Sequence, residues 1–463
     1  MPLQLINTGA ATVNLVTSDD YLQVSTSVLA VSGSDAIIGS SISSVNLNLD
    51  GYVASSINAI DITGAAVGAL TTIMIGNNGY IFGGSNAIRL VTGNYVVENH
   101  GIVTGANGIN MSSVTSSQLI NYGSITATAS SATGAEISTG GQRSVNYGSI
   151  TGFEAVDIFN TSGGGTVEFD NFGSLISTGF DAINGDSGDA DIIRNYGTIS
   201  GNVNLEGGDN SFANYGSVSG DVLNEDGNDR VVNGGEIDGD VFLAGGADVY
   251  VGQGDGFVSG TIDLGTGDDV AVMGDAGGVL LGGTGDDVIR GGEGADQIAG
   301  GADNDNIRGR QGDDILNGDA GNDVIRAGQG DDILDGGSGN DFMRGGAGDD
   351  VIIGGLGQDT MFGNAGADVF DFNSAGESPN AGVSWDRIMD FTQGEDLIDL
   401  SQFNARFIGT GAYAANGNIA EVRIFEDPNG DTRVFVDVNA DGTSDMRFYL
   451  VNTLGITADD FIL

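Results

Sequence analysis

Aspartate recurs at intervals of nine residues between Leu264 and Asp371, each time in a glycine-rich context. The stretch divides into twelve consecutive nonapeptides on the template G-G-x-G-x-D-x-U-x, where U is a large apolar residue. Eleven of the twelve carry Asp at the sixth position. A carboxylate is a hard oxygen ligand suited to calcium, and glycines allow turns with positive φ around such an ion. The spacing therefore predicts a row of calcium sites.

Two nonapeptides make one coil of a solenoid, so alternate aspartates should lie on the same edge, ~4.8 Å apart. Like charges at about 5 Å repel by ~1 kcal/mol in water, and a Ca²⁺ between them reverses the sign. Six aspartates on one edge and five on the other leave gaps for about nine ions. The predicted carboxylate ligands are Asp269, Asp287, Asp305, Asp323, Asp341 and Asp359 on one edge and Asp296, Asp314, Asp332, Asp350 and Asp368 on the other. The turn glycines predicted to complete the sites are Gly285, Gly294, Gly312, Gly321, Gly330, Gly339, Gly348 and Gly357.

Some repeats depart from the template. Gly278 stands where a further aspartate is expected, which puts a site there in doubt. Asp303 replaces the fourth glycine, Arg310 and Asn364 the second, and Ala327 the first. We expect these turns to bind calcium more weakly.

Composition points to the same class of ligand. The 463 residues carry a formal net charge of −50, which argues against nucleic acid and anionic membranes and for cations as partners. There is no cysteine and only one histidine, so zinc fits poorly, and magnesium prefers octahedral sites in which it keeps its waters. The N-terminus does not resemble a cleavable secretory signal, and no run of about 18 apolar residues predicts a transmembrane helix.

The elements that hold these residues are expected to be short parallel strands. From 49 to 263 the motif N-x-G-x-[IVL] recurs every 19 to 25 residues between Asn77 and Asn233, which predicts a parallel β-helix. The recurring asparagines would stack as an amide ladder, or alternatively mark only tight turns. The predicted fold is thus all-β: N-terminal strands or a cap at 1–48, a β-helix running into a calcium-binding parallel β-roll at 264–371, and a β-rich cap at 372–463.

The nonapeptides resemble the repeats of the RTX family of bacterial proteins. The segments WDRIMDFTQGEDLIDLS at 385–401 and LGITADDFIL at 454–463 resemble the region that follows the β-roll in serralysin-type RTX proteases. The resemblance implies an uncleaved C-terminal signal, the type I secretion machinery as partner, and an extracellular or cell-surface location. It does not carry the protease activity, because the chain has no H-E-x-x-H zinc motif.

Two functional classes remain open. The first is a non-enzymatic adhesin, matrix or surface protein that extracellular calcium folds, with cell-surface or extracellular polysaccharide as a candidate partner. The alternative is a polysaccharide lyase, epimerase or glycosidase on the β-helix. Its richest acidic cluster is Asp181, Asp186, Asp189 and Asp191, which is better explained as a solvated turn or a surface calcium site. No catalytic residue is predicted.

Overall fold

The computed structural model describes residues 3–4, 13–15, 20–31, 36–40, 45–63, 70–113, 116–138, 143–159, 165–186, 188, 190–380, 385–413 and 419–463. Within these residues the regular structure is β, apart from two 3-10 turns, η1 (Ser401–Phe403) and η2 (Ala458–Asp460). The chain forms two compact units. The N-terminal unit comprises Met1–Leu243 and Val258–Gly260, and the C-terminal unit comprises Ala244–Phe257 and Thr261–Leu463.

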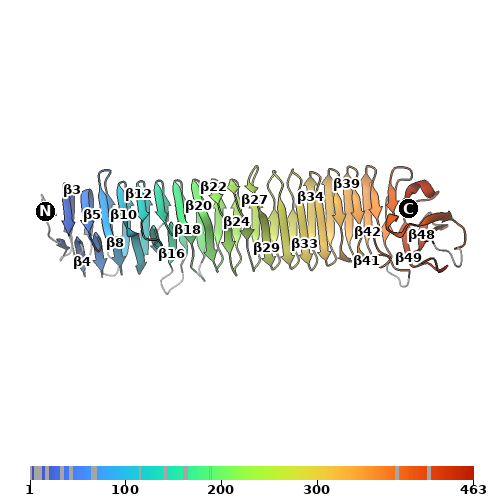
Figure 1. The fold of residues 1–463 in the computed structure, drawn as a ribbon, viewed down its shortest axis with the longest axis horizontal. Coiled ribbons are helices and arrows are strands. Elements are labelled where there is room, and N and C mark those ends of the chain that lie inside the picture. Colours follow the sequence, from blue (N-terminus) through green and yellow to red (C-terminus); the bar gives the residue numbers. More distant parts are fainter. Residues whose placement is uncertain are drawn as a thin grey trace. The chain divides into compact units, whose positions relative to one another are not determined.

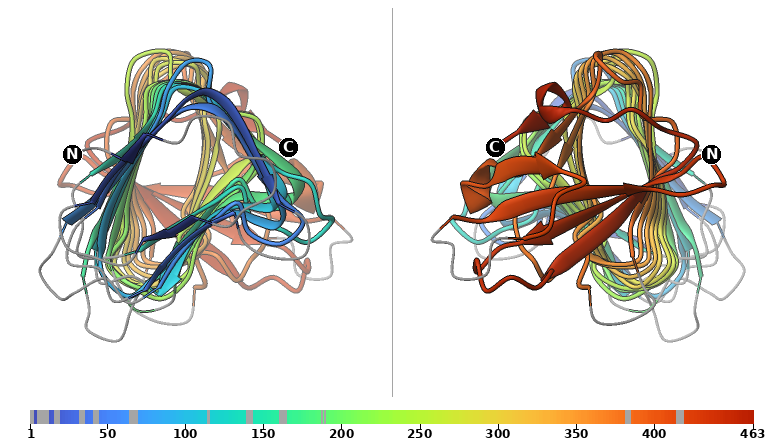
Figure 2. Two further views of the ribbon diagram at one scale, coloured as in Figure 1. Left: turned by 90° about the vertical axis from the view of Figure 1, so that its left-hand side faces the viewer. Right: turned by 90° about the vertical axis from the view of Figure 1, so that its right-hand side faces the viewer.

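The N-terminal unit is a parallel β-solenoid in which each strand pairs with strands of the coils before and after it (Figures 1 and 2). Its strands form three stacks. The first contains β1 (Leu3–Gln4), β3 (Asp20–Val31), β5 (Val45–Ser55), β7 (Leu70–Ile75), β9 (Asn94–Asn99), β11 (Ser116–Asn121), β14 (Ser144–Asn146), β17 (Val167–Asn171), β19 (Asp191–Asn195), β21 (Ser211–Asn214) and β24 (Arg230–Asn233). The second contains β12 (Ser124–Ala127), β15 (Ser149–Gly152), β22 (Ser217–Ser219) and β25 (Glu236–Ile237). The third contains β2 (Val13–Leu15), β4 (Ile37–Ser40), β6 (Ile60–Thr63), β13 (Ala135–Ser138), β16 (Val156–Phe159), β23 (Val222–Asn224) and β26 (Val241–Phe242). Four long strands pair in both the second and third stacks: β8 (Tyr80–Val91), β10 (Ile102–Ser113), β18 (Ser174–Asn184) and β20 (Thr198–Glu206).

The predicted asparagine ladder is confirmed at the ends of the first-stack strands from Asn99 onward. The prediction is wrong for Asn77, which is exposed, since Ile75 pairs with Asn99 in its place. Each side-chain amide donates through Nδ2 to Oδ1 of the asparagine one coil later, at 2.7–2.9 Å, and all members are buried. The ladder consists of Asn99, Asn121, Asn146, Asn171, Asn195, Asn214 and Asn233. Because every amide both donates and accepts, the ladder satisfies its own buried groups.

The C-terminal unit contains a parallel roll with only two strand stacks. The first contains β27 (Val249–Gly252), β30 (Val270–Val272), β32 (Val288–Arg290), β34 (Asn306–Gln311), β36 (Val324–Gln329), β39 (Phe342–Ala347), β42 (Thr360–Ala365) and β44 (Arg387–Ile388). The second contains β29 (Thr261–Thr266), β31 (Val279–Thr284), β33 (Gln297–Ala302), β35 (Ile315–Ala320), β37 (Ile333–Asp335), β38 (Ser338–Gly339), β40 (Val351–Ile353), β41 (Leu356–Gly357), β43 (Val369–Asp371) and β45 (Leu397–Asp399). Strand β28 (Phe257–Val258) contains one residue from each unit.

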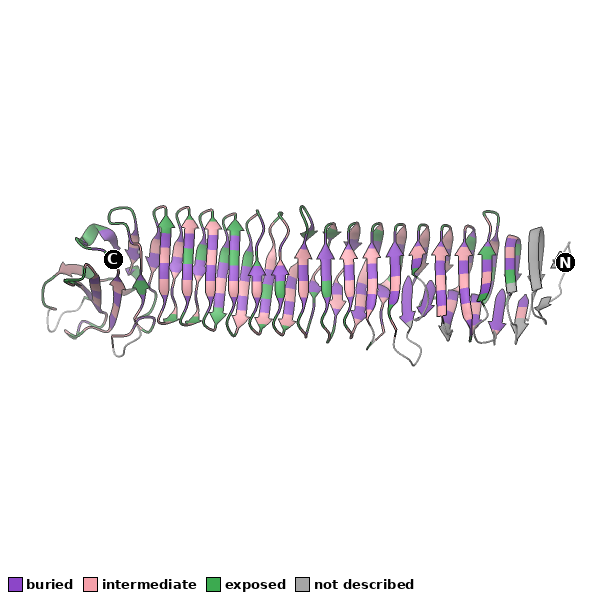
Figure 3. Ribbon diagram, turned by 180° about the vertical axis from the view of Figure 1, so that it is seen from behind, coloured by how far each residue is buried: buried purple, intermediate pink, exposed green. Residues whose placement is uncertain are grey.

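One inward side chain per strand forms the core of the roll, as the template predicts. Ile289, Ile307 and Ile325 are fully buried in successive coils of the first stack, while their sequence neighbours face outward. Figure 3 shows this alternation as buried bands between more exposed ones. The chain ends in β46 (Arg406–Gly409), β47 (Glu421–Glu426), β48 (Thr432–Asp437), β49 (Met446–Leu450) and β50 (Phe461–Ile462). The antiparallel strands β47, β48 and β49 form the predicted β-rich end, and β49 and β50 continue the two stacks of the roll.

Candidate calcium sites

The sixth-position carboxylates of the roll form two buried stacks. All eleven predicted aspartates are at most 2% exposed. In each coil the backbone N–H of one aspartate donates to Oδ1 of the aspartate in the next coil. At Asp305 and Asp323 this bond is 2.8 Å, and at Asp323 and Asp341 it is 2.7 Å. One carboxylate oxygen is therefore fixed by the backbone of the solenoid.

The second carboxylate oxygen has no hydrogen-bond donor. Buried oxygens without a partner are Oδ2 of Asp269, Asp287, Asp305, Asp314, Asp323, Asp332, Asp341, Asp350 and Asp359, and Oδ1 of Asp296. Leaving a charged oxygen buried and unpaired costs on the order of 1–3 kcal/mol or more. A row of such atoms in successive coils is the arrangement that a bound cation would stabilise.

Main-chain carbonyl oxygens lie close to several of these atoms. A Cβ atom on Gly318, the first residue of its repeat, would lie 2.5 Å from Asp323 Oδ2 and 2.6 Å from the carbonyl oxygen of Gly336 in the next coil. Glycine thus leaves a gap between a carboxylate oxygen and a main-chain carbonyl. The same pairing of atoms recurs beside Gly336, where Asp341 Oδ2 and the Gly354 carbonyl oxygen converge.

The turns keep their backbone shape where the template glycine is absent. Arg310, Asp319 and Asn364 at the second position have φ of 87°, 67° and 72°, and Asp303 at the fourth has φ of 78°. Seven of the eight predicted site glycines also have positive φ, and Gly294 is the exception. A Cβ on Gly339 would overlap the carbonyl oxygen of Gly321, one coil earlier. Glycine at this position therefore provides both the conformation and the close approach of coils.

Burial raises the pKa of the stacked carboxyls above their ordinary value of 3.8. The pKa rises to about 7 at Asp287 and Asp350 and to about 8 at Asp341. Desolvation is the main cause, and the charges of neighbouring aspartates add to it. The stack therefore resists ionisation unless a positive charge lies beside it.

One coil of the N-terminal unit contains the neutral counterpart of this arrangement. Asn210 stands where the repeats carry aspartate, and its Oδ1 accepts from the N–H of Asp191 at 2.9 Å. Its Nδ2 donates to the carbonyl oxygens of Leu205 and Glu206 at 3.3 and 3.2 Å. The NH₂ group of an amide can thus donate to turn carbonyls. A carboxylate oxygen cannot, because both groups are acceptors, so a cation must lie between them.

Both stacks extend downstream of the glycine repeats, which the sequence did not predict. The N–H of Asp359 donates to Asp386 Oδ1 at 2.9 Å, and the N–H of Asp368 donates to Asp396 Oδ1 at 3.1 Å. The signal lies in WDRIM and EDLID, where an aspartate precedes an apolar residue by two positions as in the repeats. On the upstream side, the N–H of Asp248 donates to Asp269 Oδ1 at 2.6 Å.

These donors suit calcium. Hard carboxylate and carbonyl oxygens, about one carboxylate per coil, match an ion that accepts six to eight oxygen ligands in flexible geometry. In the described part of the chain no three His, Cys, Asp or Glu side chains cluster as a conventional metal site, so carbonyls would supply most of the ligands.

Comparison with known families agrees with this geometry. The model of the RTX calcium-binding nonapeptide repeat matches residues 273–307, 308–343 and 335–370. The chain carries RTX calcium-binding repeats. Their ligand is calcium, and we refer to the two-stack part of the C-terminal unit as the RTX roll. The solution structure of the AlgE6R3 subunit of mannuronan C5-epimerase from Azotobacter vinelandii is 26% identical over 39% of this chain and 80% of its own, with a TM-score of 0.18. No curated protein matches the chain.

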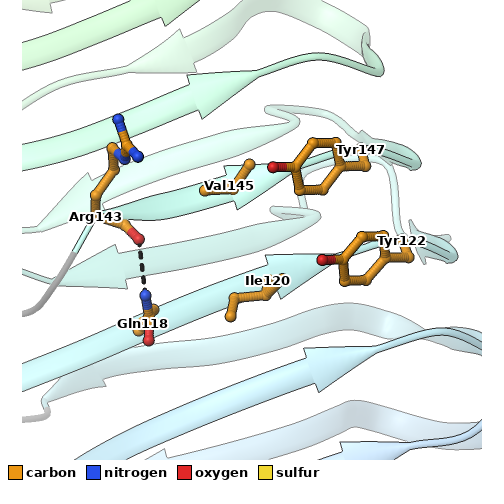
Figure 4. Close-up of a pocket in the computed structure, with 6 residues that line it drawn as sticks. All are labelled: Gln118, Ile120, Tyr122, Arg143, Val145 and Tyr147. Atoms are coloured by element: carbon orange, nitrogen blue, oxygen red, sulfur yellow. Dashed lines mark hydrogen bonds between the residues drawn. The ribbon is translucent and has the colours of Figure 1, made fainter.

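The acidic cluster considered for the enzymatic alternative is described only in part. Asp191 is buried, Asp181 accepts from Asn202 at 3.3 Å, and Asp189 lies outside the described residues. The N-terminal unit instead has a pocket of about 280 Å³ lined by Gln118, Ile120, Tyr122, Arg143, Val145 and Tyr147 (Figure 4). No helix in the described residues is long and apolar enough to span a membrane.

Proposed function

We propose that this chain is a secreted calcium-binding RTX protein whose C-terminal unit folds when it meets extracellular calcium. The buried carboxylate oxygens without donors are the observation that supports this proposal. Without calcium, successive aspartates repel and lose hydration, so the roll is unstable. At millimolar calcium the free energy of binding becomes free energy of folding. Export through the type I secretion machinery, directed by the C-terminal region, would deliver the unfolded chain to that calcium.

The folding switch is tested by circular dichroism of the full-length chain in chelator and across a calcium titration. We expect the β signal to rise cooperatively with calcium, and magnesium at equal concentration to have a much smaller effect. An identical spectrum in chelator and in millimolar calcium would refute the proposal.

We further propose a non-enzymatic role at a surface or in a matrix. The outer face of the N-terminal solenoid carries a row of hydroxyl side chains in register: Ser124, Ser149, Ser174, Thr198 and Ser217. Beside it lies a column of stacked rings with centroids 4.5–5.3 Å apart: His100, Tyr122, Tyr147, Phe172, Tyr196 and Tyr215. The rings cover one another's faces, so they support the stacking of coils and expose mainly their edges. Such a regular surface suits adhesion to an extended partner.

A polysaccharide-active enzyme is the second candidate, because the pocket in Figure 4 combines Arg143 with two tyrosine rings. Asp170 lies nearby, but both of its oxygens are paired. Oδ2 contacts Arg143 at 3.1 Å and Oδ1 contacts Arg194 at 3.0 Å. Both oxygens of Asp170 are therefore already occupied by arginine donors and do not face a substrate. Turnover of uronic-acid polymers by the calcium-loaded protein, abolished by Arg143→Gln, would establish the enzymatic role and exclude ours.

A further inference from the structure

One outward column of the RTX roll carries four arginines in consecutive coils. The arginine row consists of Arg290, Arg308, Arg326 and Arg344, which pair in register between neighbouring strands. The row takes four of the 14 basic side chains of the whole protein. Position nine of the repeats in the opposite stack instead carries Ala299, Asn317, Asp335, Ile353 and Asp371. The cationic column therefore belongs to one face of the roll.

These guanidiniums are not neutralised by the protein. In the described part of the chain none of the four forms an ion pair with a carboxylate, although acidic residues outnumber basic ones 64 to 14. Burial and the charges of Arg308 and Arg344 lower the pKa of Arg326. Like charges one coil apart repel by roughly 1 kcal/mol or more, so a bound anion would stabilise the row.

Aromatic rings hold the end of the row in place. The Arg344 guanidinium lies 5.1 Å from the ring centre of Phe342 and 4.7 Å from that of Phe362, and Arg326 lies 5.7 Å from Phe342. Stacking against rings fixes the guanidinium planes while leaving N–H groups at their edges for ligands. Less conformational freedom is then lost on binding.

The geometry points to the arginine row as a binding site for a linear polysaccharide that carries carboxylate groups. Each guanidinium is a rigid fork that matches a carboxylate with two parallel hydrogen bonds. A row of equally spaced forks suits a polymer with regularly spaced charges. This proposal rests on the proposed calcium-folded, extracellular roll, and the partner it assigns to that roll is an anionic polysaccharide.

The net charge of −50 does not preclude this ligand. Charges farther away than about 8 Å are largely screened at physiological ionic strength, and calcium neutralises the aspartate stacks. The narrow arginine row favours a single polymer strand over a wide duplex. A single glycan strand can follow one column of side chains, whereas a nucleic-acid duplex would bring its phosphates against the acidic turns at the edges of the roll.

The test measures binding of a fluorescently labelled, short uronic-acid oligosaccharide to the full-length protein in calcium, by fluorescence anisotropy. We expect Arg308→Gln combined with Arg326→Gln to weaken binding roughly tenfold or more. Arg230→Gln with Arg423→Gln removes the same charge outside the row and should change the affinity less than twofold. A neutral dextran oligosaccharide and duplex DNA should bind far more weakly than the uronic-acid oligosaccharide.

Circular dichroism in calcium checks that each variant folds, and the two single variants replace the double variant if it does not. This folding signal also separates the two proposals, because a roll that folds without calcium would contradict the proposed function while leaving the binding measurement intact. Wild-type affinity in the Arg308, Arg326 variant would show that the oligosaccharide binds outside the arginine row and would overturn the assignment. Equal loss in the control variant, or equal binding of DNA, would overturn it too.

Discussion

Replacing Asp323 by Asn should change the stability of the C-terminal unit in opposite directions with and without calcium. Asp323 lies in the middle of its stack, 1% exposed, with Oδ1 bonded to the N–H of Asp305 and Oδ2 without a donor. Asparagine keeps the Oδ1 acceptor and replaces Oδ2 with an NH₂ group. By analogy with Asn210, that group can donate to the carbonyls at the start of its own repeat.

The expected magnitudes follow from the pKa of Asp323, which burial raises to about 6 from 3.8. At pH 8 that shift corresponds to a cost of ~3 kcal/mol to the folded state for keeping Asp323 ionised. Solvent screening reduces this cost to about 1–2 kcal/mol. In chelator, Asp323→Asn should therefore stabilise the folded roll by about that amount. In calcium it removes a charged ligand between two coils, and we expect roughly tenfold to hundredfold weaker binding at those sites.

Urea unfolding followed by circular dichroism, in chelator and in millimolar calcium, measures both effects, and calorimetric titration counts the ions. Asp331→Asn is the matched control. Asp331 is exposed, and the equivalent position on the other edge carries Asn322 and Asn340, so its replacement should change little in either condition. If the Asp323→Asn protein were less stable than wild type in chelator, the assignment of Asp323 Oδ2 as an unpaired calcium ligand would be refuted.

Three further outcomes follow from the same geometry. Asn171→Ala should destabilise the N-terminal unit by about 3 kcal/mol in urea unfolding, because it removes the ladder partner of the buried amides of Asn146 and Asn195, whereas exposed Asn77→Ala should have little effect. Acid should stabilise the calcium-free roll. In the folded roll Asp341 has a pKa of about 8 and so keeps its proton, which the unfolded chain loses above about pH 4. The free energy of unfolding should therefore fall as pH rises from about 4 to about 8. Circular dichroism in chelator at pH 5 and pH 8.5 checks this order, and a more structured chain at pH 8.5 would contradict it. Asp386→Asn should reduce the number of calcium ions bound in a calorimetric titration, and an unchanged stoichiometry would remove this residue from the stack.

The repeats predict much of the site because their period fixes the register. Once two nonapeptides make a coil, the stacking of Asp287 on Asp305 follows from counting, and the structure pairs them at 2.9 Å. Counting fails where the spacing changes. Asp386 follows Asp359 by 27 residues and Asp396 follows Asp368 by 28, so the 18-residue period does not predict either pairing. The arginine row was visible in the sequence at position nine, but its meaning depends on knowing that these side chains face outward and have no acidic partner.

The N-terminal solenoid stacks buried asparagines from coil to coil, and the roll stacks buried aspartates. Only the aspartate stack requires a bound ion. An amide column is self-complementary, since every Asn donates to the next and accepts from the one before. A carboxylate column can only accept, and each coil of the roll supplies just one N–H to its two oxygens. The Asn99–Asn233 ladder should therefore make the N-terminal solenoid indifferent to calcium, while the Asp269–Asp386 stack makes the roll conditional on it. Hydrogen exchange in chelator distinguishes the units: protection should persist in the first-stack strands β11 to β21 and be lost in β32 to β42. Equal loss of protection in both units would mean that calcium acts on the whole chain and not through the carboxylate stacks.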